Sequence, residues 1–282
     1  MELIAVGGFA DVYKAIYRDF VVAVKTMRVP QDRQLRQEFE SEIRFMQTIR
    51  HENIVLFIGA GKSVVDAEPF LVTEYTQRGS LRDVLDNSEL EITTLQKINF
   101  AFDAAKGMNF LHTLSPPRLH RDLKSPNLLV SHSWTVKVAD FGFGRPLPEQ
   151  RRSRQSGDRV SDLAVPLLEI RDELSFRNVG TIRWNAPELS LGHQYNTAVD
   201  VYSFGIVMWE IWTRQLPFQQ YRFAYEVRDA VASGERPQIP DMCPQGYSRL
   251  MQQCWSAQPN QRSTFSHILK SLKTAQNLPI GN

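Results

Sequence analysis

The pattern of apolar and polar positions divides the chain into a first part rich in strands and a second part rich in helices. Short β-branched and apolar runs bounded by turn residues predict strands at 21–27, 52–61 and 69–75. Residues 32–51 instead carry apolar positions at helical spacing with charged residues between them, which predicts an amphipathic helix. Its apolar positions are Phe39, Ile43, Met46 and Ile49.

Helices dominate the pattern after residue 80. Residues 92–112 repeat apolar side chains at helical spacing, at Ile98, Phe102, Ala105 and Met108. Residues 199–212 are apolar on nearly every face, so we expect that helix to be buried all round. The pattern therefore predicts a small sheet-rich N-terminal lobe and a larger helical C-terminal lobe.

Length and composition limit the class of protein. A chain of 282 residues can form one large domain or two lobes that share a cleft. The net charge is +2, from 33 basic and 31 acidic residues, which excludes wholesale nucleic-acid or membrane-surface binding. The two cysteines, Cys243 and Cys254, lack metal-ligand spacing and indicate reduced thiols. Without a signal peptide or an apolar run near 18 residues, we expect a soluble cytoplasmic protein or a piece of a larger one.

Five polar residues form a candidate site for phosphoryl transfer, which requires charge neutralisation and an aligned nucleophile. Asp122 lies on a turn between a predicted helix and a strand and can accept a hydroxyl proton. Asn127 and Asp140 are hard oxygen donors of the kind that Mg²⁺ prefers. Lys25 lies on a predicted strand, where its ammonium can meet phosphates, and Glu42 on the predicted helix can pair with it.

These residues stand in motifs whose order resembles that of a protein kinase domain. A glycine loop comes first, followed by "VAVK" at 22–25, Glu42, "HRDLKSPN" at 120–127, "DFG" at 140–142 and "APE" at 186–188. The wording is most similar to the tyrosine-kinase-like group, which includes the Raf and mixed-lineage kinases.

The resemblance covers essentially the whole chain and implies an α+β, bilobal protein kinase fold. We expect one kinase domain over 1–282, with an N-lobe at 1–75, a hinge at 76–79 and a C-lobe at 80–282. The N-lobe would be a small antiparallel sheet with one regulatory helix, and the C-lobe would be mostly helical. The activation segment would span 140–188.

The resemblance also implies an ATP site. Lys25 would meet the α- and β-phosphates, and Asn127 and Asp140 would bind Mg²⁺. The other expected ATP contacts are the glycine loop Ala5, Val6, Gly7 and Gly8, the roof Val12 and Ala23, the gatekeeper Thr73, the hinge residues Glu74, Tyr75 and Thr76, and the floor Leu129. Two of the three glycine positions of the loop hold alanine, Ala5 and Ala10. Alanine at Ala10 would be costly if that position needs a positive φ.

Further positions match parts of the family that hold the active state. Met46, Phe57, His120 and Phe141 match a regulatory spine between the lobes. Glu188 would pair with Arg262 at the end of the activation segment, and Asp200 would tie a central helix to the catalytic loop.

The resemblance implies that Asp122 is the base and that Lys124 is catalytic. A lysine at 124 and a threonine at 181 accompany serine/threonine specificity in the family, so we expect transfer from ATP to Ser or Thr hydroxyls of protein substrates. Dual specificity stays open, as does a pseudokinase scaffold or allosteric partner with weak or no transfer, since the glycine loop is atypical. A kinase-domain dimer is possible by analogy with Raf-like kinases.

The activation segment contains an unusual stretch at 145–178, which begins basic and turns apolar. In protein kinases, the arginine at the position of Arg121 often binds a phosphorylated activation-loop residue. We hypothesise that phosphorylation orders the segment, at one or more of Ser153, Ser156, Ser161 and Ser175. The alternatives are a passive loop, or a short inhibitory apolar element formed by Leu163, Val165, Leu168 and Leu174, although Pro166 argues against a continuous helix there.

Overall fold

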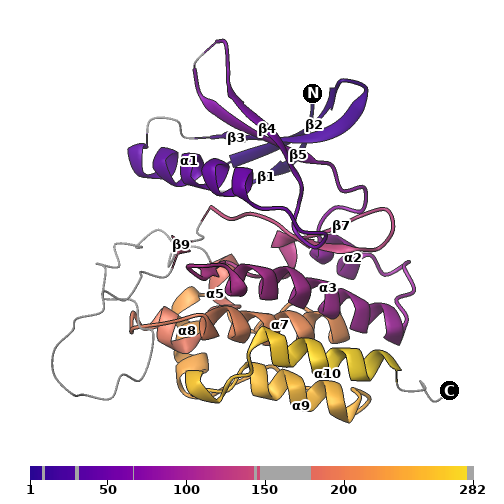
Figure 1. Ribbon diagram of the computed structural model, residues 1–282. Helices are drawn as coiled ribbons and strands as arrows, with labels where there is room; N and C mark the ends of the chain where they lie inside the picture. The colour runs from indigo at the N-terminus through magenta and orange to yellow at the C-terminus, as the bar shows by residue number, and fades with distance from the viewer. Residues whose placement is uncertain (8–9, 29–31, 66, 143–144, 147–178, 278–282) are drawn as a thin grey trace.

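A five-stranded antiparallel sheet forms the upper lobe in Figure 1, and a group of helices forms the lower lobe. The computed structural model describes residues 1–7, 10–28, 32–65, 67–142, 145–146 and 179–277. The two lobes and their relative sizes agree with the expected α+β bilobal fold.

The N-lobe sheet has the strand order β1-β2-β3-β5-β4. Its strands are β1 (Glu2–Val6), β2 (Ala10–Tyr17), β3 (Phe20–Met27), β4 (Phe57–Lys62) and β5 (Pro69–Glu74). A two-residue turn joins β2 to β3, and both of its residues, Arg18 and Asp19, have positive φ. Such a turn matches the natural twist of a tight hairpin, so β2 and β3 pair along their whole length.

Helix α1 (Arg33–Thr48) lies beside this sheet (Figure 1), and one stripe of its side chains is buried. The Asp32 carboxylate caps its first turn by accepting from the N–H groups of Gln34 and Leu35. The predicted stripe is buried at Phe39, Met46 and Ile49, but Ile43 is only half-buried. Phe45 and the acidic Glu42 are buried instead. The buried face of α1 therefore includes side chains that contact Phe141 in the other lobe.

The predicted strand at 52–61 begins later than expected, at Phe57. The earlier residues pair with the C-lobe instead: Val55 N–H donates to Val138 O, and Val138 N–H donates to Asn53 O. The backbone of helix α3 (Thr94–Thr113) approaches this segment closely at Gly107, where a Cβ would lie 2.5 Å from Asn53 O. Residues 53–55 therefore connect the N-lobe to the C-lobe core, which an apolar run alone does not reveal.

The C-lobe is built around α7 (Ala198–Thr213), in which every residue from Val199 to Trp212 is buried. This confirms the prediction of a helix buried all round. Helix α7 packs against α3 and α9, and α3 packs against α10. The other helices are α2 (Leu81–Asp86), α3 (Thr94–Thr113), α5 (Val179–Ile182), α6 (Pro187–Ser190), α8 (Ala224–Ala232), α9 (Gln245–Cys254) and α10 (Phe265–Asn277), with 3₁₀ turns η1 (Ser125–Asn127) and η2 (Pro259–Gln261).

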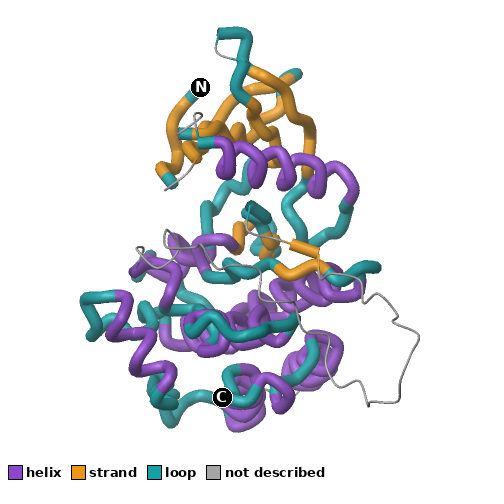
Figure 2. Tube along the Cα trace, turned by 90° about the vertical axis from the view of Figure 1, so that its left-hand side faces the viewer, coloured by secondary structure: helices purple, strands orange, loops and turns teal. Residues whose placement is uncertain are grey.

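Two pairs of short strands lie at the top of the C-lobe, next to the N-lobe (Figure 2). They are β6 (Arg118–Leu119) paired with β9 (Arg145–Pro146), and β7 (Leu128–Val130) paired with β8 (Val136–Val138). Strand β5 ends at Glu74 and α2 begins at Leu81, so residues 75–80 link the lobes. Residues 76–79 of the predicted hinge fall in this link together with Tyr75, whereas Glu74, which was also expected at the hinge, ends β5.

Candidate active site

Three charged side chains from separate elements meet between the lobes. Lys25 on β3 lies 2.9 Å from Glu42 Oε2 on α1 and 2.8 Å from Asp140 Oδ1, just after β8. Burial alone lowers the pKa of Lys25, but the carboxylates of Asp140 and Glu42 outweigh it and raise the pKa above the ordinary lysine value. Burial likewise opposes ionisation of Asp140, yet Lys25 lowers the pKa of that carboxyl to about 2. The cluster therefore keeps a charged ammonium beside an ionised carboxylate.

The loop that follows β6 is held from below by Asp200 on α7. The Asp200 carboxylate accepts from His120 N–H at 2.9 Å and from Arg121 N–H at 2.8 Å, and His112 Nε2 lies 2.8 Å away. Arg121 has a positive φ of 68°, which an L-residue adopts only where its surroundings fix it. Burial opposes ionisation of Asp200, but its bond with His112 and the neighbouring histidines and amide lower its pKa. The predicted link between the central helix and this loop is thus present as hydrogen bonds.

Asp122 lies at the centre of the polar contacts of this loop. Asn127 Nδ2 donates to Asp122 Oδ2 at 2.9 Å and to its backbone oxygen at 2.8 Å. Lys124 Nζ lies 2.8 Å from Asp122 Oδ2 and donates to Thr181 Oγ1 at 2.9 Å. Asp122 is only 6% exposed, so these contacts fix its carboxylate in one orientation. Lys124 therefore bridges the proposed base and the end of the activation segment.

The glycine loop has a different conformational requirement at each of its positions. Gly7 N–H donates to Ala10 O at 2.8 Å, and a Cβ on Gly7 would lie 2.8 Å from that same oxygen, so this position requires glycine. Ala5 lies in β1 and Ala10 begins β2, and neither has a positive φ. The two alanines therefore cause no backbone strain. Gly8 lies outside the described residues.

The strand register places the expected roof residues of the ATP site on the face of the sheet that carries Lys25. Val12 pairs with Lys25, and Ala23, two residues before Lys25, pairs with Thr73. Cross-strand partners and residues two apart share a face, so these side chains line one surface. The expected adenine-contact residues Val12, Ala23, Thr73, Tyr75 and Leu129 are half-buried, and Thr76 is buried.

Glu74 differs from the other expected ATP contacts in what its side chain does. Its carboxylate accepts from Leu56 N–H at 2.8 Å and from Lys137 Nζ at 2.7 Å. The side chain is therefore used to connect the segment before β4 to β8, which leaves only the backbone of Glu74 for a nucleotide. Val6, at the end of β1, is exposed.

Of the residues of the expected regulatory spine, Phe141 lies against His120, and Met46 and Phe57 belong to the same hydrophobic core. The Phe141 ring lies 5.4 Å from the His120 ring, and its N–H donates to Glu42 Oε1 at 3.2 Å. Met46 is buried and Phe57 packs on the same core from the N-lobe. Phe45, which no sequence motif indicated, also touches Phe141, with ring centroids 5.5 Å apart. The segment after β8 is thus attached to α1 through both an apolar contact and a backbone hydrogen bond.

Two further acids, Glu188 and Glu210, are buried in the C-lobe. Glu188 forms a bidentate pair with Arg262, at 2.5 and 2.9 Å, as the resemblance implies. Glu210 was not anticipated, although an acid within the apolar run 199–212 is itself an anomaly that could have flagged it. Its carboxylate is completely buried on α7 and accepts bonds from Ser125, Trp184 and Arg82.

The proposed metal ligands fit a magnesium ion in their chemistry. Asn127 uses its amide nitrogen to donate to Asp122, which leaves Oδ1 available as a ligand, and Asp140 supplies an ionised carboxylate. Mg²⁺ is commonly held by one or two such oxygens together with phosphate and water. Among the described residues, no three His, Cys, Asp or Glu side chains gather as a cation site made by protein alone.

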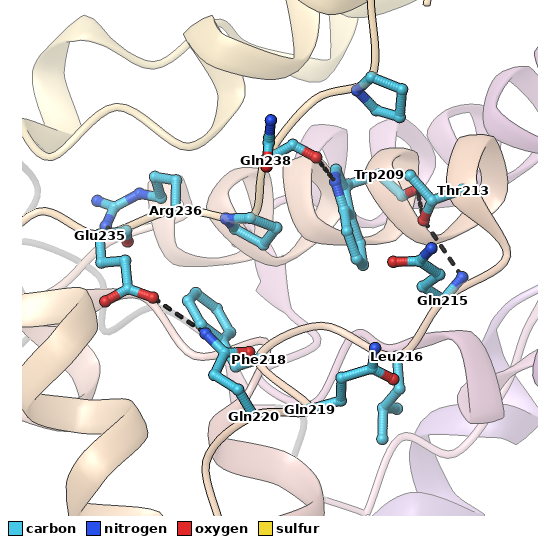
Figure 3. Close-up of a pocket in the computed structure, with 12 residues that line it drawn as sticks. Trp209, Thr213, Gln215, Leu216, Phe218, Gln219, Gln220, Glu235, Arg236 and Gln238 are labelled. Carbon is cyan, nitrogen blue, oxygen red and sulfur yellow. Dashed lines mark hydrogen bonds between the residues drawn. The ribbon is translucent and has the colours of Figure 1, made fainter.

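A separate hollow of about 470 Å³ lies in the C-lobe, beside the end of α7 (Figure 3). Trp209, Phe218 and Gln238 are among its lining residues, and Trp209 Nε1 donates to Gln238 O at 2.8 Å across it. None of the residues that we expect to bind ATP or metal lines this hollow.

The stretch with the candidate phosphorylation sites lies outside the described residues. This holds for Ser153, Ser156, Ser161 and Ser175 and for the proposed apolar element Leu163, Val165, Leu168 and Leu174. The hypotheses about phosphorylation and inhibition therefore stay predictions.

Comparison with known families identifies the class to which this site belongs. Residues 1–272 match the family model described as the protein kinase domain. The chain therefore belongs to the protein kinase family, and the fold that the resemblance implies is confirmed. Members of this family use ATP and a divalent metal to phosphorylate proteins.

Named relatives include kinases of more than one specificity. A probable serine/threonine-protein kinase of Dictyostelium discoideum is 38% identical over 98% of this chain and 24% of its own length. The dual specificity protein kinase shkC of the same organism is 36% identical over 96% of this chain and 50% of its own length. The serine/threonine/tyrosine-protein kinase HT1 of Arabidopsis thaliana is 36% identical over 95% of this chain and 64% of its own length.

The chain thus spans from about a quarter to just under two thirds of these three relatives. Within the part of the chain that the structure describes, no helix combines the length and apolar character needed to cross a membrane.

Proposed function

We propose that the chain is a protein serine/threonine kinase that transfers the γ-phosphate of ATP with Mg²⁺ as its metal. The observation that carries this proposal is the bridge from Lys124 to both Asp122 and Thr181. The bridge supports binding of a substrate whose hydroxyl is on a short side chain, Ser or Thr, close to the catalytic loop. There Asp122 can reach the hydroxyl. The names of the relatives support the same hydroxyl preference.

Asp122 is the proposed base. Its carboxylate accepts the proton of the substrate hydroxyl while the hydroxyl oxygen attacks the γ-phosphorus and the bond from that phosphorus to the β–γ bridging oxygen breaks. Lys124 lies beside Asp122, so its ammonium can offset negative charge on the transferring phosphoryl group. Asn127 holds the Asp122 carboxylate in place through its amide hydrogen bonds.

Lys25 is the proposed ligand of the α- and β-phosphates, and Glu42 holds the Lys25 ammonium in place through a hydrogen bond. Asn127 and Asp140 are the proposed ligands of Mg²⁺, which when bound neutralises phosphate charge. The face that carries Val12, Ala23 and Lys25 would cover the nucleotide.

Two alternatives remain. A pseudokinase scaffold was favoured only by the atypical glycine loop, and the absence of positive φ at Ala5 and Ala10 weakens that argument. Dual specificity is supported by the names of two relatives. A kinase-domain dimer, a cytoplasmic location and an activation loop ordered by phosphorylation also stay proposals.

The experiment that tests the proposal combines nucleotide binding with phosphate transfer. The purified chain is heated with and without ATP and Mg²⁺, and then incubated with a generic basic protein and labelled ATP. We expect a raised melting temperature and label on serine and threonine but not tyrosine. An Asp122→Asn variant should bind ATP but transfer no label. Binding without transfer by the phosphorylated wild type would support the scaffold instead, and label on tyrosine would support dual specificity.

The activation-loop proposal has its own test. All four serines at 153, 156, 161 and 175 are changed to alanine, and the rate of transfer is compared with that of the wild type. We expect a lower rate, because the phosphate that would order the segment is lost. An unchanged rate would remove the idea.

A further inference from the structure

Glu210 is a buried acid that the proposed chemistry does not use. Its side chain is 0% exposed within the core of the C-lobe. Oε1 accepts from Ser125 Oγ at 2.7 Å and from Arg82 Nη1 at 3.1 Å, and Oε2 accepts from Trp184 Nε1 at 2.6 Å. An ionised carboxylate is costly to bury, so three short bonds to one such group imply a definite arrangement.

The donors to Glu210 come from three different elements. Ser125 begins η1 in the catalytic loop and directly follows Lys124, and Trp184 lies three residues after Thr181 in the activation segment. Arg82 comes from α2 and also donates to the Arg214 backbone oxygen at the end of α7. One rigid, buried carboxylate therefore fixes the catalytic loop and the end of the activation segment relative to each other.

The same two segments meet again at the bridge of Lys124. The Lys124 ammonium lies between Asp122 and Thr181. Lys124 is one residue before Ser125 in the catalytic loop, and Thr181 is three residues before Trp184 in the activation segment. The local segments are further constrained because Ser203 on α7 donates to Trp184 O at 2.8 Å and Trp184 N–H donates to Thr181 O. A change at Glu210 would thus be transmitted to Lys124 over short, well-defined connections.

We propose that Glu210 is a positioning residue for phosphoryl transfer, which holds the catalytic loop and the activation segment so that Lys124 meets both Asp122 and Thr181. The proposal rests on the proposed kinase function and extends it to a residue that touches neither ATP nor metal. Glu210 acts on the loop that carries Asp122 and Lys124, and its hydrogen bonds involve neither Lys25 nor Asp140.

The electrostatics of Glu210 support this role. Burial raises the pKa of Glu210 to about 7, and the bonds from Ser125, Trp184 and Arg82 oppose that rise. The ionised form of Glu210 therefore depends on these three donors, because burial alone favours the protonated acid. Loss of any one donor weakens the hold on the other two.

The test uses two Trp→Phe substitutions as a matched pair. Trp184→Phe removes the indole N–H that donates to Glu210, whereas Trp209→Phe, one residue away from Glu210 on α7, removes the bond to Gln238 O shown in Figure 3. Both indoles are buried and each makes one short bond, so the two variants lose similar interactions. Glu210→Gln, which keeps the shape but loses the charge, is the direct variant.

Four quantities are measured on the full chain: kcat and KM for the basic protein, the dissociation constant for ATP with Mg²⁺, and amide hydrogen exchange at 120–127 and 181–186. For Glu210→Gln and Trp184→Phe we expect kcat to fall by roughly tenfold to a hundredfold, because small displacements of catalytic groups have effects of that size. The ATP dissociation constant should stay within about twofold, and exchange in both segments should become faster. Trp209→Phe should change none of these quantities. The double variant Trp184→Phe/Glu210→Gln should be no slower than the slower single variant.

Several outcomes would overturn the inference. These are an unchanged kcat in Glu210→Gln, an equal loss in Trp209→Phe, or a parallel loss of ATP binding and turnover, which would indicate general destabilisation. A wild type that transfers no phosphate would contradict the proposed function only. In that case hydrogen exchange decides the inference: faster exchange of both segments in Glu210→Gln and Trp184→Phe but not in Trp209→Phe supports it, and unchanged exchange overturns it.

Discussion

Lys25 Nζ lies 2.8 Å from Asp140 Oδ1, which joins the proposed phosphate ligand on β3 to a proposed metal ligand after β8. These residues are 115 positions apart in the chain. Glu42 accepts from Lys25 and from the N–H of Phe141, so α1 is bonded to Lys25 and to the residue that follows Asp140. The position of α1 therefore determines whether the charged groups of both lobes are assembled.

Lys25→Met is expected to abolish detectable phosphate transfer. The substitution keeps the length of the side chain but removes the ammonium, and loss of one preorganised charge from a site typically lowers kcat by about 10²–10³. The measurement is labelled phosphate transfer at saturating ATP. Lys62→Met, an exposed lysine at the end of β4 in the same sheet, is the control and should keep full activity. Unchanged turnover in Lys25→Met would contradict the assigned role.

Substitutions at Gly7 and Ala10 in the glycine loop should have different effects on ATP affinity. Ala10→Gly should leave ATP affinity equal or improve it, because alanine causes no backbone strain there and its methyl group only narrows the approach to the nucleotide. Gly7→Ala should weaken ATP binding, because its Cβ would lie 2.8 Å from Ala10 O and the loop must shift. Both are measured by titration with ATP and Mg²⁺. Weaker binding by Ala10→Gly would show that our account of the loop is wrong.

Thr181 provides a test of the bridge to Lys124. Thr181→Val removes the hydroxyl that accepts from Lys124 at 2.9 Å but keeps the shape of the side chain. We expect kcat for the basic protein to fall by about tenfold, within the range for removal of a group that positions a catalytic residue. Thr181→Ser, which keeps the hydroxyl, should stay near the wild type. Equal rates in both variants would mean that the hydroxyl does not matter.

The sequence predicted the elements whose pattern is local. Strand β3 and helices α1, α3 and α7 follow from periodicity over adjacent residues, and the structure has each of them near the expected bounds. The segment before β4 was predicted wrongly because Ile54 and Val55 are apolar on either interpretation. Whether an apolar run pairs with its own sheet or with the other lobe depends on Val138, which lies more than 80 residues away.

The site was predictable only as far as the motifs extend. The order of the motifs indicated Lys25, Glu42, Asp122, Asn127 and Asp140, and the structure brings them together in two groups. The buried position of Glu210 depends on three donors that are distant in sequence, and no periodicity connects them. Burial of Glu42 likewise requires Lys25, because an unpaired acid would not remain ionised there.

Removing one partner of the buried pair of Glu188 and Arg262 should destabilise the protein strongly. Arg262 is 7% exposed and Glu188 is 8% exposed, so removing one partner leaves a buried charge without compensation. Arg262→Met should lower the free energy of unfolding by about 3–5 kcal/mol, measured by urea denaturation. Arg228→Met, which breaks the exposed pair with Asp229, should change it by less than about 1 kcal/mol. A similar small loss in both variants would mean that the buried pair contributes little.

Glu210 should make the stability of the folded protein depend on pH in a predictable direction. Burial raises its pKa from the ordinary value of 4.5 to about 7, so between these values the folded state holds a proton that the unfolded state has released. The free energy of unfolding therefore falls as pH rises through this window and levels off above pH 7.

Glu210→Gln removes this contribution, so the comparison of the two proteins isolates it. From pH 5.5 to pH 8 the stability of the wild type relative to Glu210→Gln should fall by about 2 kcal/mol. The measurement is urea denaturation of both proteins at the two pH values, in which other titrating groups cancel. Arg82 is the only charged side chain that contacts Glu210 in the described residues. A constant difference between the two proteins would mean that Glu210 is ionised in the folded state over the whole range.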